Sequence, residues 1–356
     1  MKKQIKVKFL GFWPSFLEKD NIFLKILREK YDCIISNDDA DYIVCSVFCD
    51  ENMDYYTYCN YPQIRIMISG ENYIPDFNFI DYGISSYQIK YLDRHFYLPF
   101  ALFSTRAEEL SKKKRVYDSS LLSEKRYFAN FISGHESENN IRGDFFKKLS
   151  RYKRVESPGR FLNNMEDNFV VDFRDDSKIK FQRECKFTIC FESTKHEGFI
   201  TEKIIDAFLA DTIPIYYGST TVNQIFNEKA FINCNSFNSF DEVIEKVIEL
   251  DNNDDEYLEM LCQPIFLSDS YYSNLNKELE SFICNIFDQS KTDAYRRSLV
   301  YSPKEHEKYI CGLQKIKSYK MSLELLSDKS VKQLAHAIFV KVCAKFRLIC
   351  RRGKKH

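Results

Sequence analysis

The sequence predicts an α/β protein with two domains that face each other across a cleft. A chain of 356 residues exceeds the usual size of one domain. In both halves of the chain, runs with strand periodicity alternate with runs of helical spacing, as in open α/β sheets. A polar stretch at residues 108–125 has few apolar side chains and is expected to be a linker. We therefore expect a first domain at residues 1–118 and a second at residues 126–325.

The first domain begins with a segment, residues 5–9, in which apolar side chains alternate with lysines, and this pattern predicts a strand. Residues 22–27 follow with the spacing of one face of a helix. Two more strands are expected at residues 42–48 and 64–69. The order strand, helix, strand, strand is typical of an open α/β sheet.

The second domain repeats this pattern. Residues 186–191 alternate as a strand, residues 201–209 have helical spacing, and residues 213–217 form another apolar run that ends at a glycine. Such a unit is expected to be parallel with a right-handed crossover. Residues 256–300 are expected to form further helices. Ligands of parallel sheets bind beyond the carboxyl ends of the strands, so residues at strand ends are the candidates for function.

Charge and composition exclude several classes of protein. The 52 lysines and arginines equal the 52 aspartates and glutamates, so bulk electrostatic binding of nucleic acid is not expected. We interpret the basic run at residues 112–115 as part of a solvated linker. None of the twelve cysteines lies in a CxxC pair, which indicates reduced thiols in a cytoplasmic compartment. No apolar run is long enough to span a membrane, and lysines interrupt the N-terminal apolar segment. We expect neither a secreted nor an integral membrane protein.

One candidate functional residue lies at a strand end in the first domain. Glu71 directly follows the strand at residues 64–69, and the preceding Gly70 is expected to permit an unusual backbone angle. A glutamate here is either a turn carboxylate satisfied by backbone donors or a general base that faces the cleft. Spacing alone favours the turn carboxylate.

A second group of candidates surrounds a strand-to-helix connection in the second domain. The strand ends at Glu192, and Thr201 is a plausible N-cap of the next helix. Glu202 and Lys203 then lie in the first turn, where free N–H groups and the helix dipole favour a phosphate. Ordinary charge placement explains Glu202 equally well, because acidic residues favour helix starts. It explains Lys203 less well, because a cation there opposes the dipole.

Three segments resemble the α1,3/4-fucosyltransferases of glycosyltransferase family 10, particularly the bacterial members. Residues 186–219, which contain FES, FITEKI and IPIYYG, are similar to the donor-binding signature of that family. Residues 70–100, which begin GENYIPDF, are similar to another block, and residues 130–146 match more weakly. The three blocks follow the family order.

The resemblance implies a GT-B fold with two Rossmann-like α/β domains facing a cleft. It implies GDP-fucose as the donor, inversion at the anomeric carbon, and an oligosaccharide or glycolipid acceptor such as one containing N-acetyllactosamine. Carried over by position, Glu71 is the general base. Arg142 and Lys203 hold the pyrophosphate, and Glu202 accepts from ribose or fucose hydroxyls. The implied donor-binding residues are Arg142, Glu192, Ser193, Phe199, Thr201, Glu202 and Lys203.

Two positions depart from the family pattern. Ser193 stands where the family usually has asparagine, and Phe199 where it usually has tyrosine. Both changes concern contacts to the donor. The departing diphosphate can be stabilised by fixed positive charge, so no metal cofactor is required, although divalent ions could stimulate the reaction. We interpret the acidic stretch at residues 172–176 as surface rather than as a metal motif.

The C-terminal tail, residues 329–356, has its own pattern. It contains nine lysines or arginines and no acidic residue, and apolar residues recur in it at helical spacing. This pattern favours a helix lying on an anionic membrane surface. The alternative is a helix packed on the body of the protein with a solvated basic face. With the membrane interpretation, the expected location is cytoplasmic and peripheral, on the inner face of the cytoplasmic membrane.

Three functions remain open at this level. The leading one is an inverting α1,3-fucosyltransferase acting on Lewis-type or lipopolysaccharide glycans. The second is the same fold and chemistry with another nucleotide sugar. The third is a non-catalytic protein that binds a glycan or a nucleotide, against which the joint presence of Glu71, Arg142, Glu202 and Lys203 argues.

Overall fold

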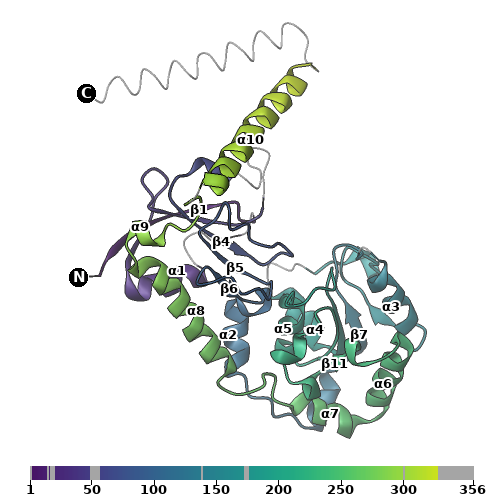
Figure 1. Cartoon of the computed structure of the whole chain (residues 1–356). Coiled ribbons are helices and arrows are strands. Elements are labelled where there is room, and N and C mark those ends of the chain that lie inside the picture. The colour runs from purple at the N-terminus through teal and green to yellow at the C-terminus, as the bar shows by residue number, and fades with distance from the viewer. Residues whose placement is uncertain are drawn as a thin grey trace.

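The computed structural model contains two parallel β-sheets, each covered by helices (Figure 1). It describes residues 2–13, 16, 21–48, 57–137, 139–171, 176–299 and 301–327. The prediction of two α/β domains is confirmed. We call the six-stranded sheet and its helices the first domain, and the five-stranded sheet and its helices the second domain.

The first sheet has the strand order β2-β1-β3-β4-β5-β6, and every neighbouring pair is parallel. Its strands are β1 (Gln4–Leu10), β2 (Asp32–Ile35), β3 (Tyr42–Cys45), β4 (Ile64–Ser69), β5 (Tyr82–Ser85) and β6 (His95–Tyr97). All residues of β3 and β4 are buried, as expected for central strands that are covered on both faces. The expected strands here are confirmed, although β3 ends before residue 48.

The second sheet has the order β11-β10-β9-β7-β8, again with parallel pairs throughout. Its strands are β7 (Tyr127–Phe131), β8 (Val155–Glu156), β9 (Cys185–Phe191), β10 (Ile213–Tyr217) and β11 (Ile232–Asn233). The predicted parallel unit of strand, helix and strand is β9, α5 (Glu202–Leu209) and β10. The carboxyl end of β9 therefore leads directly into the loop before α5.

The remaining helices surround the two sheets. They are α1 (Ile22–Lys30), α2 (Thr105–Lys112), α3 (Ile141–Leu149), α4 (Ser177–Arg183), α6 (Phe240–Asn252), α7 (Asp254–Cys262), α8 (Tyr271–Asp288), α9 (Lys291–Ala294) and α10 (Tyr301–Ser327). In Figure 1, α8 runs beside the first domain, and α10 extends away from it.

The C-terminal helices return to the first domain. The hydroxyl of Tyr31 donates to Asp288 of α8 at 2.6 Å, and Lys3 donates to the carbonyl of Phe287 at 2.6 Å. Arg297 forms a buried ion pair with Asp81, just before β5. These contacts place α8, α9 and the start of α10 with the first sheet, whereas the sequence prediction assigned residues 126–325 to the second domain. The chain therefore passes from one domain to the other twice.

The segment between the domains is more ordered than predicted. Residues 105–112 form α2, which caps at Ser104 and packs against α5. Lys113 pairs with Asp211 at 2.8 Å. Arg115 is buried, lies over the ring of Phe208 at 5.4 Å and donates to a backbone carbonyl. The interpretation of this basic run as solvated therefore holds for the exposed Lys112 and Lys114 and is wrong for Lys113 and Arg115, whose partners lie in the second domain.

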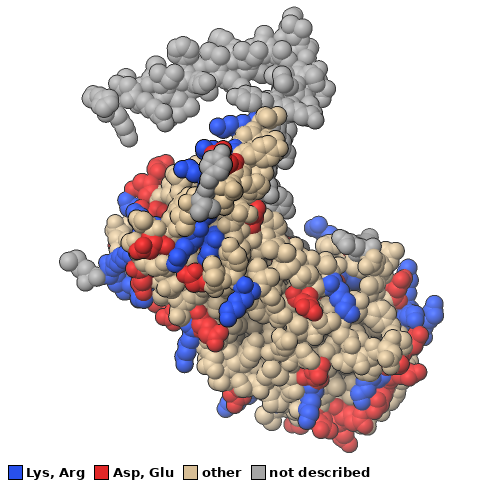
Figure 2. All heavy atoms as spheres, in the orientation of Figure 1, with Lys and Arg blue, Asp and Glu red and all other residues tan. Residues whose placement is uncertain are grey.

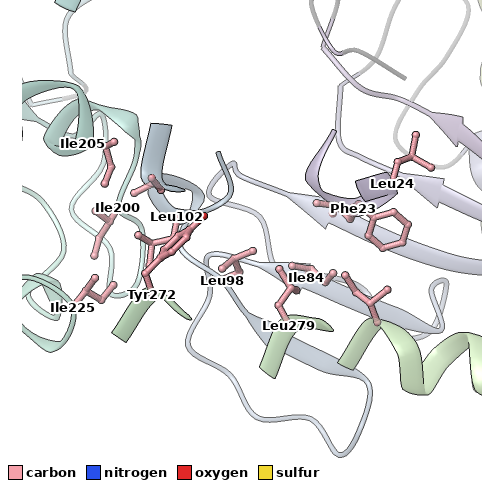
Figure 3. Close-up of a cluster of buried hydrophobic side chains, with 14 of the residues drawn as sticks. Phe23, Leu24, Ile84, Leu98, Leu102, Ile200, Ile205, Ile225, Tyr272 and Leu279 are labelled. Atoms are coloured by element: carbon pink, nitrogen blue, oxygen red, sulfur yellow. The ribbon is translucent and has the colours of Figure 1, made fainter. Parts of the chain in front are cut away.

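One hydrophobic core extends across the domain boundary. Leu98 and Leu102 of the first domain lie in the same cluster as Ile200 and Ile205 of the second, together with Tyr272 of α8 (Figure 3). Burying each such side chain contributes about 1.5–3 kcal/mol. The two domains are therefore held together by hydrophobic packing as well as by the chain segments that connect them.

The distribution of charge on the described surface agrees with the zero net charge of the sequence. Basic and acidic side chains are interspersed over both domains on the face shown in Figure 2. No helix among the described residues is long and apolar enough to cross a membrane. The basic tail at residues 329–356 lies outside the described residues, so its membrane role stays a prediction.

Candidate active site

A cavity of about 580 Å³ opens at the carboxyl edge of the second sheet. Loops that follow β7, β8 and β9 line it, together with the first turns of α3, α4 and α5. This is the position expected for a ligand of a parallel α/β sheet, and the size is that of a small-molecule site. Of the predicted donor-binding residues, the cavity is lined by Arg142, Ser193, Glu202 and Lys203.

The cavity wall is basic. Arg142, Lys178 and Lys203 line it against one carboxylate, Glu202, and Arg160 lies exposed at its edge. Free N–H groups at the start of α5 add a partial positive charge. The wall is therefore suited to an anionic ligand, and a helix N-terminus beside lysine and arginine is a typical phosphate site.

Glu192 holds the start of α5 in place. It follows β9, is 3% exposed, and its N–H donates to the carbonyl of Tyr217 at 2.8 Å. Its carboxylate accepts from the N–H and the hydroxyl of Thr201, both at 2.7 Å, and from Lys203 Nζ at 3.1 Å. Thr201 occupies the N-cap position as predicted, but its hydroxyl donates to Glu192 and accepts from Lys203 at 2.8 Å. Glu192 and Thr201 thus orient Lys203 from behind, without lining the cavity.

The charges at this helix start keep each other ionised. Burial opposes ionisation of Glu202, but the positive charges of Lys203 and Lys178 lower its pKa to about 2. Burial likewise opposes the charge of Lys203, but Glu192 and Glu202 raise its pKa above the ordinary value. At neutral pH the site therefore contains a carboxylate that accepts hydrogen bonds beside a cation that donates them.

Arg142 joins two loops at the cavity wall. It lies in the first turn of α3 and is 2% exposed. Its guanidinium donates twice to the carbonyl of Phe191, at 3.1 and 2.9 Å. It also donates to the hydroxyl of Ser133 at 3.3 Å and to the carbonyl of His135 at 3.2 Å. Arg142 therefore ties the end of β9 to the loop after β7, in addition to facing the cavity.

The loop between β9 and α5 presses against the first domain. Gly198 has a φ of +81°, and a Cβ there would lie 2.5 Å from the carbonyl oxygen of Ser86 and 2.8 Å from the ring of Tyr97. The hydroxyl of Tyr97 donates to the Gly198 carbonyl at 3.3 Å. Phe199 is buried at 4% exposure and is not among the residues that line the cavity. Its predicted contact with the donor stays a prediction.

Glu71 follows β4 of the first domain and lies close enough to Lys203 and Glu202, at the start of α5, for their charges to act on it. It is exposed, and its carboxylate has no hydrogen-bond partner among the residues that the structure describes. Desolvation by neighbouring protein atoms raises its pKa although the residue is exposed, and of the two nearby charges Lys203 lowers that pKa and Glu202 raises it. The structure thus brings the candidate base and the candidate donor site together.

Gly70 is required for a reason other than the predicted one. The described glycines with positive φ are Gly11 and Gly198, so an unusual backbone angle is not the explanation at Gly70. A Cβ at Gly70 would lie 2.1 Å from the ring of Phe100. The absence of a side chain lets this aromatic ring pack directly under the turn that carries Glu71.

The sequence prediction missed Lys178. This residue lies in the first turn of α4, is buried, lines the cavity and donates to Asp206 at 2.7 Å. The signal that identified Lys203, a lysine in a first helical turn, was also present here. Residues 172–175 of the neighbouring acidic stretch lie outside the described residues, and Asp176 is exposed as predicted.

Within the part of the chain that the structure describes, no group of three or more histidine, cysteine, aspartate or glutamate side chains is arranged to hold a metal ion. The expectation that no metal cofactor is required stays a prediction.

Two family descriptions match the chain. "Glycosyltransferase family 10 (fucosyltransferase) C-term" matches residues 122–306, and "Alpha-(1,3)-fucosyltransferase FucT N-terminal domain" matches residues 7–104. Together they cover both domains, including the positions of Glu71 and the cavity.

Among curated relatives, the chain is 30% identical over 259 residues to the alpha-(1,3)-fucosyltransferase FucT of Helicobacter pylori, covering 63% of this chain and 53% of that protein. It is 27% identical over 231 residues to a putative fucosyltransferase of Acanthamoeba polyphaga mimivirus, covering 62% and 36%. The chain thus spans about half the length, or less, of these relatives.

Solved structures agree with this assignment. A crystal structure of an alpha1,3-fucosyltransferase aligns with a TM-score of 0.67 and 26% identity, over 81% of this chain and 91% of that one. A crystal structure of alpha1,3-fucosyltransferase with GDP aligns with a TM-score of 0.64 and 27% identity, over 81% and 92%. The predicted GT-B arrangement of two α/β domains is confirmed, and the chain belongs to glycosyltransferase family 10, the fucosyltransferases.

Proposed function

We propose that the protein is an inverting α1,3-fucosyltransferase that moves L-fucose from GDP-fucose to a hydroxyl of an N-acetylglucosamine-containing glycan. The observation that carries this proposal is the position of Glu71 opposite a basic cavity at the start of α5. Lys203 and Glu202 lie close enough to Glu71 to shift its pKa. The printed activities of the relatives, and the GDP bound to one solved structure, support the choice of donor.

The donor occupies the cavity of the second domain in this proposal. Its diphosphate lies at the N-terminus of α5, where Lys203 neutralises charge and Arg142 contributes from the first turn of α3. Glu202, ionised because of Lys203 and Lys178, accepts hydrogen bonds from sugar hydroxyls. As the bond to the anomeric carbon breaks, charge grows on the leaving GDP, and these fixed cations stabilise it.

Glu71 removes the proton of the acceptor hydroxyl. The acceptor oxygen then bonds to the anomeric carbon from the face opposite GDP, and the electron pair of the breaking bond leaves with the diphosphate. A single displacement of this kind inverts the configuration and passes through an oxocarbenium-like state. The raised pKa of Glu71 makes it a stronger base than an ordinary exposed glutamate.

The acceptor and the location form part of the proposal. We take the acceptor to be a Lewis-type or lipopolysaccharide glycan, presented as an oligosaccharide or glycolipid. The basic tail at residues 329–356 would hold the enzyme at the inner face of the cytoplasmic membrane, close to a lipid-linked acceptor. Support for this part comes from the sequence pattern of the tail.

A donor screen tests the proposal. The protein is incubated with a panel of nucleotide sugars, and nucleotide release is measured with and without N-acetyllactosamine, in the presence of EDTA or of added divalent ions. We expect acceptor-dependent GDP release from GDP-fucose, with EDTA leaving activity in place. Turnover of a different nucleotide sugar alone would contradict the choice of donor, and binding without turnover would indicate a non-catalytic protein.

One observation favours keeping another nucleotide sugar as the second candidate. Ser193 lines the cavity at a position where the resemblance leads us to expect asparagine. A shorter side chain leaves more room and one fewer amide donor at the sugar, so the panel includes GDP-mannose as well as UDP-sugars. Product analysis of the linkage then separates α1,3 from α1,4 transfer.

A further inference from the structure

Besides the exposed Arg160, three cations that the protein holds in place line the cavity, and they differ in how many of their N–H donors remain for a ligand. Arg142 makes four hydrogen bonds to the protein, so one of its five donors remains. Lys203 donates to Glu192 and Thr201, so one of its three donors remains. Lys178 makes a single hydrogen bond among the described residues, to Asp206 at 2.7 Å. Of these three held cations, Lys178 has the largest share of donors available.

The surroundings of Lys178 fix its position. Its side chain is 7% exposed, and its partner Asp206 on α5 is fully buried. Asp206 also accepts from Arg106 of α2 at 2.8 Å. Two cations therefore share this carboxylate, and Arg106, whose side chain is 26% exposed, also lies 3.9 Å from Asp176. An ammonium group held in this way loses little freedom when a ligand binds.

We propose that Lys178 is a further donor-binding residue, which contacts an oxygen of the diphosphate of a nucleoside diphosphate in this cavity, and that Asp206 and Arg106 are its positioning residues. The inference rests on the proposed function for the identity of the ligand. It adds a contact to the diphosphate from α4, whereas Arg142 and Lys203 approach the ligand from α3 and α5. It also assigns a role to the buried ion pair with Asp206, because a buried pair of this kind is by itself weak evidence for stability.

The ligand charge distinguishes this role from a structural one. We compare the binding of GDP and of guanosine by titration calorimetry for wild type and Lys178→Met. Loss of a charge-assisted contact is expected to weaken GDP about 10-fold or more, while guanosine, which has no phosphate, binds within about 2-fold of wild type. Asp206 keeps Arg106 as a partner in this variant, which limits the cost to folding.

Lys180→Met is the matched control. It removes the same charge from the same helix, but Lys180 is exposed and does not line the cavity. It is expected to bind GDP as wild type does, so an equal loss in both variants would assign the effect to net charge and overturn the contact. Lys178→Arg keeps the charge and is expected to restore most of the preference for GDP over guanosine.

The remaining outcomes also decide the question. Equal GDP affinity in wild type and Lys178→Met overturns the inference, as does an equal loss of GDP and guanosine binding, which would indicate a structural role. If Lys178→Met does not fold, we use the double variant Lys178→Met/Asp206→Asn, which removes both charges of the buried pair. A folded double variant that binds GDP like wild type overturns the inference. A wild-type protein that binds GDP but transfers no fucose contradicts the proposed function alone, and one that does not bind GDP contradicts both.

Discussion

Glu71 combines two properties at the residue scale: an exposed carboxylate without a hydrogen-bond partner in the described structure, and a pKa raised by desolvation from neighbouring protein atoms. Glu71→Gln is expected to keep GDP binding and to lose turnover by about 10²–10⁴-fold, the usual contribution of a positioned general base. Turnover rates and GDP titrations of the variant measure both effects, and unchanged turnover would remove Glu71 from the mechanism. Glu197→Gln, an exposed glutamate in the loop before α5, is the control.

The same carboxylate predicts the acid limb of the pH profile. Because Glu71 acts as a base only when ionised, the rate should rise with pH through its folded pKa. That pKa is raised, so the midpoint of the acid limb should lie above the ordinary glutamate value, and measured rates of Glu71→Gln should lack this limb.

Arg142 and Lys203 are both expected to bind phosphate, but the structure separates their other roles. Lys203→Ala and Arg142→Ala should each weaken GDP and GDP-fucose alike, by about 1.5–3 kcal/mol for a charge-assisted contact. Arg142→Ala should in addition lower thermal stability, because it releases the Phe191 carbonyl and the loop after β7. Calorimetry and thermal melting read the two effects separately, and unaffected GDP binding would contradict the phosphate role.

Phe199 tests whether the ring after Gly198 lies against the donor. The side chain is buried, outside the lining of the cavity. If it contacts the donor when GDP-fucose binds, Phe199→Tyr should be tolerated or tighten binding, whereas Phe199→Ala should lose affinity as well as packing. Titration of both variants with GDP-fucose decides this, and equal, negligible changes in affinity would place Phe199 away from the donor.

At the scale of elements, the loop between β9 and α5 is one part of the second domain that contacts the first. Gly198→Ala would force a side chain into a left-handed backbone position and toward the Ser86 carbonyl. We expect a loss of about 1–3 kcal/mol in the free energy of unfolding and a fall in activity, because the loop must move with the start of α5. Gly312→Ala is the control, since that helical position has open space around it and should be neutral or stabilising. Equal melting temperatures of the two variants would show that the contact between this loop and the first domain tolerates a displacement of the loop.

At the scale of the whole molecule, all described strands and helices of both domains lie before residue 328, and the basic tail follows α10 in the sequence. A chain cut after residue 328 should therefore stay folded and keep activity on a soluble disaccharide. It should lose affinity for anionic vesicles, where each basic residue near the surface contributes about 1 kcal/mol. Co-sedimentation of full-length and truncated protein at low and high salt measures this, because salt screens the attraction. Equal pelleting would exclude the tail as the anchor, and unfolding on truncation would indicate that its apolar face packs on the body.

The predictions from sequence succeeded where a local pattern carries the information. The strand at residues 64–69, the helix after Thr201 and the parallel unit from β9 to β10 follow from hydrophobic periodicity and capping. They failed where the outcome depends on distant partners. Arg115 is buried because it stacks on the ring of Phe208 and donates a hydrogen bond to a backbone carbonyl of the second domain. The sequence around residue 115 contains no pattern that predicts these distant contacts.

For the candidate site, too, some features could be predicted from the sequence and others only from the structure. The sequence by itself determined the α/β class, the family, and the strand ends at which Glu71 and the TEK segment lie, because these depend on residues adjacent in the chain. Only the tertiary structure decided that Glu192 faces inward behind Lys203, that Lys178 joins the cavity, and that α8 to α10 return to the first sheet. Burial and charge pairing depend on which segments meet in space, and residues such as Lys178 and Asp206, which are 28 positions apart, acquire their roles only when folding brings them together.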